Sequence, residues 1–356
     1  VTQRAWRVSR KPGAIQIAKI YSDFADSLRE QIPKNSSSRS NTVEMLAVGY
    51  WFEGLKQRTG LKTAYALELY FEKESFRRNT NGTIRHYRSK WSRYEQKMIS
   101  PKAKTLSRVE LLAPGSSRDL NHPIWTLMKL ISRQQKISFD SYFRTLNTDI
   151  QLVLYRNTSN MIWDSVQREP ITQVLLEKLE RRASLDALAA LIAIVVEANH
   201  LGRKAVAIKA ASTLHKVLLM LAMELQARGV AVGLIDWLAF NVLHLGVPAH
   251  LQIWMNSTDY IHASAHLNTM VYQHPDRRGK TLPWKLRTRL MCKLLAGDMG
   301  IDVLHAMRPQ FELREDIGEI AAEFVEDFKK TSALRTWGWM CIIDGTPQVV
   351  RPAALL

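Results

Sequence analysis

Apolar residues recur at helical spacing along most of the chain. Between positions 43 and 58, Met45, Val48, Phe52 and Leu55 fall on one side of a helix that ends at Thr59, just before Gly60. Glycine suits the left-handed position that follows a helix C-terminus. A second helix, predicted at 62–76, begins only a few residues later, so the pattern predicts a helix, a tight turn and a helix.

The same spacing continues on both sides of this pair. Ten consecutive apolar residues at 187–196 and seven at 217–223 predict helices that are apolar around most of their circumference, and such helices belong in the centre of a bundle. The stretch 139–166 is rich in aromatic residues and also indicates helix. Only Asp344-Gly345 gives a hairpin signal, which Pro347 weakens. Further helices are predicted at 15–31, 83–97, 102–112, 122–131, 231–245, 258–270, 282–296 and 315–331.

The pattern therefore predicts an all-α, multi-helical fold in two parts. Residues 1–165 form a basic helical unit, and residues 166–356 form an Ala/Leu-rich helical bundle. At 356 residues, the chain is long enough for two domains of about 150 residues each. We expect the bundle to mediate assembly, either as a homo-oligomer or with a protein partner.

The two halves of the chain differ strongly in net charge. Residues 1–170 hold 29 Lys and Arg against 15 Asp and Glu, a net charge of +14, whereas residues 171–356 hold 21 against 18, a net charge of +3. Between Arg77 and Arg108 there are ten basic residues and one acid, Glu95. Such a density of like charge repels itself unless a polyanion lies against it. Nucleic acid is the commonest polyanion partner, and we expect DNA rather than RNA.

The helix predicted at 83–97 has two different sides. Ile84, Tyr87, Trp91 and Tyr94 form an apolar and aromatic stripe that is expected to pack on neighbouring helices. His86, Lys90, Arg93 and Lys97 form a cationic face for phosphates. The full set of predicted nucleic-acid-binding residues is Arg77, Arg78, Arg85, His86, Arg88, Lys90, Arg93, Lys97, Lys102, Lys104 and Arg108.

Two quantitative expectations follow from this face. If about eight phosphate contacts form, log affinity falls with log salt at a slope of about −7. Replacement of Lys90, Arg93 and Lys97 together by Glu is expected to abolish binding without unfolding the chain. The helix pair that precedes this face is compatible with a helix-turn-helix-like DNA-binding unit.

A second interpretation belongs to another class of protein. The basic face would meet an acidic protein surface, and the chain would be a helical scaffold subunit of a bacterial multi-protein complex that serves defence or a mobile element. Retention of bare DNA in a shift assay separates the two interpretations, because a scaffold binds no nucleic acid without its partner.

The sequence contains no motif that names a reaction, so we do not expect an enzyme, a catalytic residue or a cofactor. His262 and His266 stand four residues apart with Asp259 one turn earlier, which is the best metal candidate, but no fourth ligand can be assigned from the sequence and no metal site is assigned. A third interpretation, a metal-dependent enzyme around His262 and His266, is tested by metal analysis of the purified protein. Two cysteines fit a reducing, cytoplasmic location. The longest stretch without charge, 237–258, is broken by Gly246 and Pro248, so no membrane segment is expected.

Overall fold

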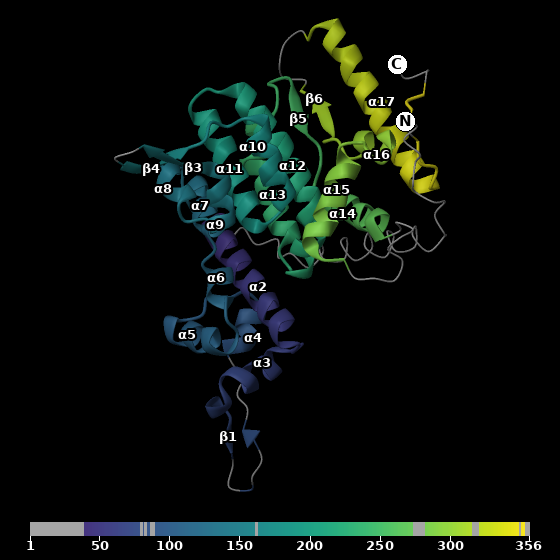
Figure 1. Ribbon diagram of the computed structural model, residues 1–356. Coiled ribbons are helices and arrows are strands. Elements are labelled where there is room, and N and C mark those ends of the chain that lie inside the picture. Colours follow the sequence, from purple (N-terminus) through teal and green to yellow (C-terminus); the bar gives the residue numbers. More distant parts are fainter. Residues whose placement is uncertain are drawn as a thin grey trace. The chain divides into compact units, whose positions relative to one another are not determined.

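The computed structural model describes residues 39–78, 81, 84–85, 90–160, 163–272, 282–314, 320–348 and 350–352. Helices make up most of these residues, and the strands form three small antiparallel pairs (Figure 1). The predicted all-α, multi-helical fold is therefore confirmed. The helix predicted at 15–31 lies outside the described residues.

The chain divides into two compact units, and the division differs from the one expected at residue 165. The smaller, which we call the basic unit, comprises residues 34–138 and 224–234. The larger unit comprises the described residues of 139–223 and 235–356. The chain passes from one unit to the other inside helices α12 (Lys204–Ala227) and α13 (Ala231–Asn241), where sequence periodicity gives no boundary signal.

The basic unit is built around the long helix α2 (Arg39–Thr59). Its buried side faces a cluster of large apolar residues in which Trp51, Phe71, Trp91 and Tyr94 pack ring against ring. Its other elements are α3 (Ala64–Phe71), the 3₁₀ turn η1 (Lys73–Ser75), β1 (Arg77–Arg78), β2 (Ile84–Arg85), α4 (Lys90–Glu95), α5 (Ala103–Leu112), α6 (Ser116–Leu120) and α7 (Pro123–Ser132).

The predicted helix, turn and helix are present at α2 and α3. Gly60 adopts φ +73°, and its N–H donates to the carbonyl of Lys56 (2.9 Å), which closes the end of α2. Thr63 then caps α3, because its hydroxyl accepts from the N–H of Ala66 (3.1 Å). Helix α3 ends at Phe71 rather than at residue 76, since the chain turns through η1 into a strand.

The larger unit has the apolar helix α11 (Leu185–His200) at its centre. Every residue from Ala187 to Val196 is buried, as the ten-residue apolar run predicted. Gly246 lies close to α12, and only glycine fits at this position, because a Cβ on residue 246 would lie 2.2 Å from the Cβ of Ala211. The remaining elements are α8 (Phe139–Phe143), α9 (Thr148–Leu154), β3 (Tyr155–Asn160), β4 (Trp163–Arg168), α10 (Gln173–Arg182), η2 (Leu243–Gly246), β5 (Leu251–Ile253), α14 (Ser257–Tyr272), α15 (Trp284–Leu295), α16 (Ile301–Ala306), β6 (Phe311–Leu313) and α17 (Ala322–Asp344).

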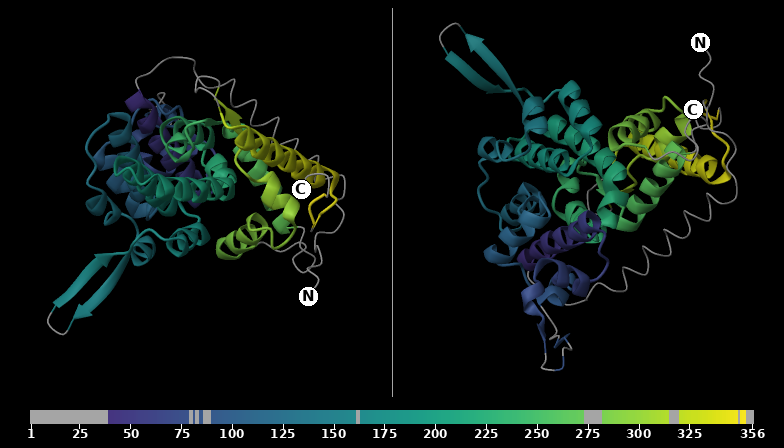
Figure 2. Two further views of the ribbon diagram at one scale, coloured as in Figure 1. Left: turned by 90° about the horizontal axis from the view of Figure 1, so that it is seen from above. Right: turned by 60° about the horizontal axis from the view of Figure 1, so that its bottom comes forward.

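The stretch 139–166 is only partly helical, which corrects the prediction. After α9, strands β3 and β4 pair antiparallel with two residues between them, and this hairpin extends away from the helices (Figure 2). Asn, Thr and Ser in the hairpin are poor helix formers. Its base is tied down where Arg168 donates to the carboxylate of Glu197 (2.7 Å) and where the hydroxyl of Tyr155 donates to that of Asp140 (2.8 Å).

The Asp-Gly signal near the C-terminal end marks a helix end rather than a hairpin. Helix α17 runs to Asp344, and Gly345 follows it with φ +70°. The N–H of Gly345 donates to the carbonyl of Cys341. A residue pair that suits a hairpin turn also suits a helix C-terminus, because both require a positive φ.

Candidate nucleic-acid interface

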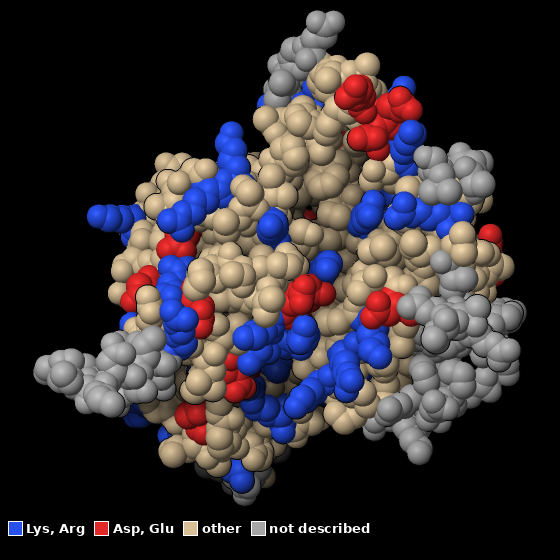
Figure 3. All heavy atoms as spheres, turned by 45° about the horizontal axis from the view of Figure 1, so that its top comes forward, with Lys and Arg blue, Asp and Glu red and all other residues tan. Residues whose placement is uncertain are grey.

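The positive charge of the chain is concentrated in the basic unit. This unit holds 21 Lys and Arg against nine Asp and Glu, a net charge of +12, whereas the rest of the chain accounts for only +5 of the total of +17. Acidic side chains lie against basic ones at several places on the face shown in Figure 3. Some cations of the basic unit are therefore paired inside it, and others are exposed.

A strand pair replaces the first part of the helix predicted at 83–97. Residues 84–85 form β2, which pairs antiparallel with β1 so that Arg77 stands opposite Arg85 and Arg78 stands opposite Ile84. The helix α4 begins only at Lys90. His86 and Arg88 lie outside the described residues. The predicted cationic helix face is therefore wrong. Arg85, expected in that helix, and the flanking Arg77 and Arg78 stand instead on a small hairpin, beyond α3 at one end of the basic unit (Figure 1).

Lys90 is held inside the unit by a carboxylate. Its Nζ donates to Oε1 of Glu72 (2.7 Å) and to the hydroxyl of Thr105 (3.3 Å). The other carboxylate oxygen of Glu72 accepts from the indole N–H of Trp91 (3.0 Å), and both Glu72 and Trp91 are buried. The predicted packing of Trp91 and Tyr94 is confirmed. Lys90, which was expected to face a phosphate, pairs with the carboxylate that also binds Trp91.

Lys97 is also engaged within the basic unit. Its Nζ donates to the carbonyl of Gly229 (2.9 Å), and its side chain lies where a Cβ on Gly49 would be, 2.7 Å from its Cε. Burial lowers the pKa of Lys97, partly offset by the charge of Glu53. Lys97 thus joins the segment 224–234 to helix α2 inside the basic unit.

The remaining predicted cations lie on or near α4 and α5. Arg93, Lys102 and Lys104 are exposed, whereas Arg108 pairs with the exposed Glu74. Lys104 and Arg108 are one helical turn apart, and they line a hollow of about 300 Å³ together with Glu72, Glu74, Lys90 and Thr105. Glu74, which lines this hollow, precedes Arg77 of the hairpin by three residues in the sequence.

Among the described residues of the same unit, Lys62, Lys73 and Lys136 are exposed lysines outside the range 77–108, and the first two are close in sequence to the hairpin or to α3. Lys62 lies in the turn between α2 and α3, and Lys73 lies in η1, directly before the hairpin. A count of cations over the whole compact unit finds them, whereas a count along the sequence window does not. Together with Arg93, Lys102 and Lys104, Lys62 and Lys73 leave five exposed lysine and arginine side chains close in sequence to the hairpin or to α3–α5.

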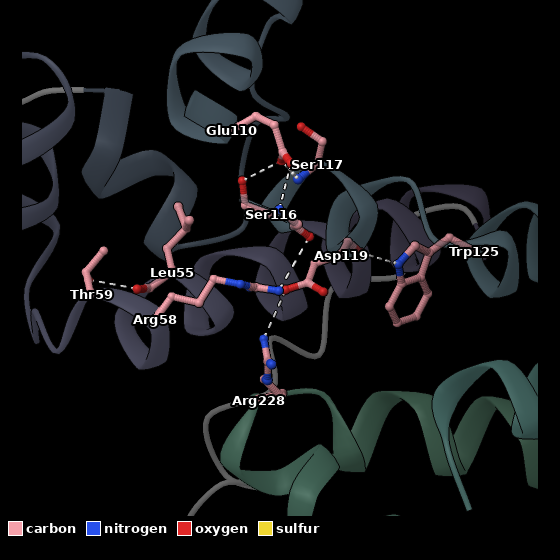
Figure 4. Close-up of polar contacts among 10 residues, drawn as sticks. Leu55, Arg58, Thr59, Glu110, Ser116, Ser117, Asp119, Trp125 and Arg228 are labelled. Carbon is pink, nitrogen blue, oxygen red and sulfur yellow. Dashed lines mark hydrogen bonds and ion pairs between the residues drawn. The ribbon is translucent and has the colours of Figure 1, made fainter. Parts of the chain in front are cut away.

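A polar network holds the helices that carry these cations (Figure 4). The carboxylate of Glu110 accepts from the backbone N–H groups of Gly115 and Ser117 (both 2.6 Å) at the start of α6, and these bonds lower its pKa to about 2. Asp119 pairs with Arg58 and with Arg228 (3.2 Å). Arg58 and Arg228 are therefore also paired inside the basic unit.

An apolar surface lies on another side of α3 and α5. A second hollow, of about 460 Å³, is lined by Arg58, Thr59, Leu61, Tyr70, Leu112, Ala113 and Pro114. Tyr70 is 44% exposed, Leu112 is 50% exposed and the adjacent Leu111 is 83% exposed. Exposed apolar side chains of this size beside an arginine are typical of protein contact surfaces.

The histidine pair considered for a metal does not form a cluster of ligands. Asp259 accepts from the N–H of Asn256 (2.8 Å), while Oδ1 of Asn256 accepts from the N–H of Asp259 (3.2 Å), so both side chains cap helix α14. His266 packs against Trp339. Within the described ranges, no three His, Cys, Asp or Glu residues are grouped so as to hold a metal ion.

Helix α12 is long and apolar enough to cross a membrane, but 67% of its apolar stretch is buried in the protein, as in the core helix of a soluble protein. Comparison with protein-family models, with curated proteins and with solved structures finds no match to this chain.

Proposed function

We propose that the chain is a nucleic-acid-binding protein, and that the basic unit contacts phosphates through its hairpin and the exposed cations of α4 and α5. The observation that carries this proposal is the charge of +12 in a unit of 116 residues. That unit uses Lys90, Lys97 and Arg228 internally and still presents exposed cations. A net charge of this size destabilises a compact unit by self-repulsion, and a bound polyanion relieves the repulsion.

The hairpin supports the same proposal. Arg77 and Arg85 occupy directly opposite positions on two strands of only two residues each. Like charges at opposite positions destabilise a strand pair, and a pair this short has little other stabilisation. A phosphate backbone against the hairpin would supply a counter-charge for both arginines.

The structure changes the expected salt dependence. With Lys90 and Lys97 engaged internally, about six phosphate contacts remain, so log affinity should fall with log salt at a slope of about −5 instead of −7. Duplex and single-stranded DNA of the same length should both bind, because the contacts are to the backbone and no base-reading helix is present among the described residues of the hairpin region.

Fluorescence anisotropy with labelled DNA tests the proposal. Replacement of Arg77, Arg78 and Arg85 together by Glu should weaken binding at least about 100-fold in 100 mM salt. The matched control replaces Arg203, Lys204 and Lys209 by Glu, because these are exposed cations of the larger unit and give the same change in net charge. Equal losses in the two variants would show that only net charge matters, and no binding by the wild type would refute the proposal.

The apolar hollow favours a second candidate function, a helical interaction subunit. We propose as its occupant an acidic segment of a protein partner that inserts an apolar side chain between Tyr70 and Leu112, with Arg58 at the rim of the hollow. The positive charge of the unit complements such a segment. This function requires that Leu112→Asp abolish partner capture while DNA binding is unchanged, whereas loss of DNA binding in Leu112→Asp would contradict it.

A further inference from the structure

The outer side of helix α3 carries an exposed aromatic ring close to the arginine hairpin. Tyr65 is 45% exposed, and Leu69, one helical turn further on the same side of α3, is 38% exposed. Tyr70, which lines the apolar hollow, stands five residues from Tyr65 and therefore faces another side of the helix. Phosphate contacts by the hairpin leave the ring of Tyr65 without a role.

A ring contact ties Tyr65 to the start of the hairpin, which extends beyond α3 (Figure 1). The ring of Tyr65 lies edge-on to that of Phe76, with 5.3 Å between centroids. Phe76 is half-buried and directly precedes Arg77, the first residue of β1. Its N–H donates to the carbonyl of Lys73 (3.3 Å), so the backbone of Lys73 also lies close to Phe76. We call Tyr65 and Phe76 the α3 ring pair.

Exposed cations border the α3 ring pair on two sides. An exposed lysine stands three residues before each ring, Lys62 at the start of α3 and Lys73 in η1. The two acids of α3 and its C-cap, Glu68 and Glu72, are buried. The nearby exposed acid, Glu74, forms an ion pair with an arginine of α5. An exposed aromatic ring bordered by cations suits a ligand that combines flat apolar surfaces with negative charge.

A single strand of nucleic acid is a ligand of this kind. Each unpaired base has a π-face that can stack on an aromatic side chain, and each phosphate between the bases is an anion. In a duplex, by contrast, the bases stack on one another, and only their edges reach the grooves. The exposed ring of Tyr65 therefore distinguishes unpaired bases from paired ones, whereas the cations contact the phosphates of both.

We propose that the α3 ring pair is a base-stacking platform for single-stranded nucleic acid. Tyr65 stacks on an unpaired base, while Lys62, Lys73 and the hairpin contact the phosphates on either side of that base. This inference rests on the nucleic-acid function proposed above and deepens it, because it names the form of nucleic acid that binds most tightly. Duplex DNA binds through phosphate contacts alone, and so binds more weakly.

Fluorescence anisotropy of the wild-type chain tests the contribution of the bases. The probes are a labelled single strand of about 15 nucleotides and an abasic sugar-phosphate strand of the same length and charge. The single strand should bind at least about tenfold more tightly, since stacking of one base on an aromatic side chain adds roughly this factor. Equal affinity for the two strands would overturn the proposal. The comparison uses the wild type alone and depends on no variant.

Variants of Tyr65 locate the effect in α3. Tyr65→Leu keeps an apolar side chain against Phe76 but removes the ring, so it should weaken single-strand binding about tenfold and leave duplex affinity unchanged. Tyr65→Phe keeps the ring and should bind both forms as the wild type does. Tyr70→Leu is the matched control, because Tyr70 is 44% exposed on another side of the same helix, and it should leave both affinities unchanged.

Three results would contradict the stacking platform. Tyr65→Leu could weaken single-strand and duplex binding equally, Tyr70→Leu could weaken single-strand binding as much as Tyr65→Leu does, or Tyr65→Leu could bind the single strand as tightly as the wild type. The last result would assign the exposed side of α3 to a protein partner instead.

Failure of the platform is distinguishable from failure of the nucleic-acid function. A wild-type chain that binds duplex DNA, the single strand and the abasic strand with equal affinity retains the nucleic-acid function and lacks only the platform. A chain that binds none of the three probes lacks both.

Discussion

The buried Glu72 gives the sharpest test of how the basic unit uses its own charges. In Glu72→Ala, the indole N–H of Trp91 loses its carboxylate acceptor, and the ammonium of Lys90 keeps only the hydroxyl of Thr105 of its two side-chain acceptors. Trp91 is 0% exposed and stacks parallel to Phe71 at 5.5 Å, so its N–H cannot turn toward water without moving the ring out of the core.

The magnitude follows from the exposure of the two donors. An unsatisfied buried N–H costs about 1–3 kcal/mol. Lys90 retains 38% of its side-chain exposure, so water replaces much of its lost partner and this contribution is only about 0–1 kcal/mol. We therefore expect Glu72→Ala to destabilise the basic unit by about 1–4 kcal/mol. Glu72→Gln keeps an acceptor for Trp91 and should cost about 1 kcal/mol.

Urea unfolding followed by circular dichroism measures the loss, and amide hydrogen exchange of α3 and α4 locates it in the basic unit. Glu74→Ala is the control, because this exposed acid lies two residues away and pairs only with an exposed arginine. Its unfolding midpoint should match that of the wild type. A loss below about 1 kcal/mol in Glu72→Ala, or unchanged exchange in α4, would refute the argument that these charges support the core.

Three further outcomes follow from the structure. Backbone hydrogen bonds from Ser117 and Gly115 hold the pKa of Glu110 at about 2, so the stability that this carboxylate adds should be complete above about pH 4.5 and be lost as pH falls toward 2. In Glu110→Gln, the free energy of unfolding measured over this pH range should not show this fall. Burial lowers the pKa of His215 to about 4, so the unfolded chain takes up this proton at a higher pH than the folded chain does, and stability should fall as pH drops from 6.5 to 4. In His215→Gln, the slope of unfolding free energy against pH in this range should correspond to one proton fewer. Gly338→Ala should destabilise the larger unit by about 3 kcal/mol in thermal unfolding, because its Cβ meets backbone of α16, whereas Thr336→Ala on the exposed side of α17 should not.

The candidate interface shows where reasoning from sequence stops. The pattern of Trp91 and Tyr94 correctly predicted core packing, since a helical spacing of aromatics fits a buried stripe. The same pattern was extended back to residue 83 and gave a helix where residues 84–85 pair with 77–78. Hydrogen bonds between two segments about seven residues apart form the strand pair in place of the helix. A strand of two residues is too short to show an alternation of apolar and polar residues in the sequence.

Lys90 and Lys97 make the same point for charge. Along the sequence they are indistinguishable from Lys102 and Lys104, because no acid lies near any of them except Glu95. In the fold, Lys90 meets Glu72, and Lys97 meets a carbonyl 132 residues away in the chain. A local charge count therefore overestimates the cations that a partner can reach.

The sequence by itself determined the helical class, the central buried helix at 187–196, the turn at Gly60 and the excess of positive charge, because each depends on residue type and short-range spacing. The tertiary structure alone decided which residues make up the basic unit and which cations are paired inside it. Those outcomes depend on contacts between segments distant in the chain, and the free energy of such contacts leaves no local period or motif to read.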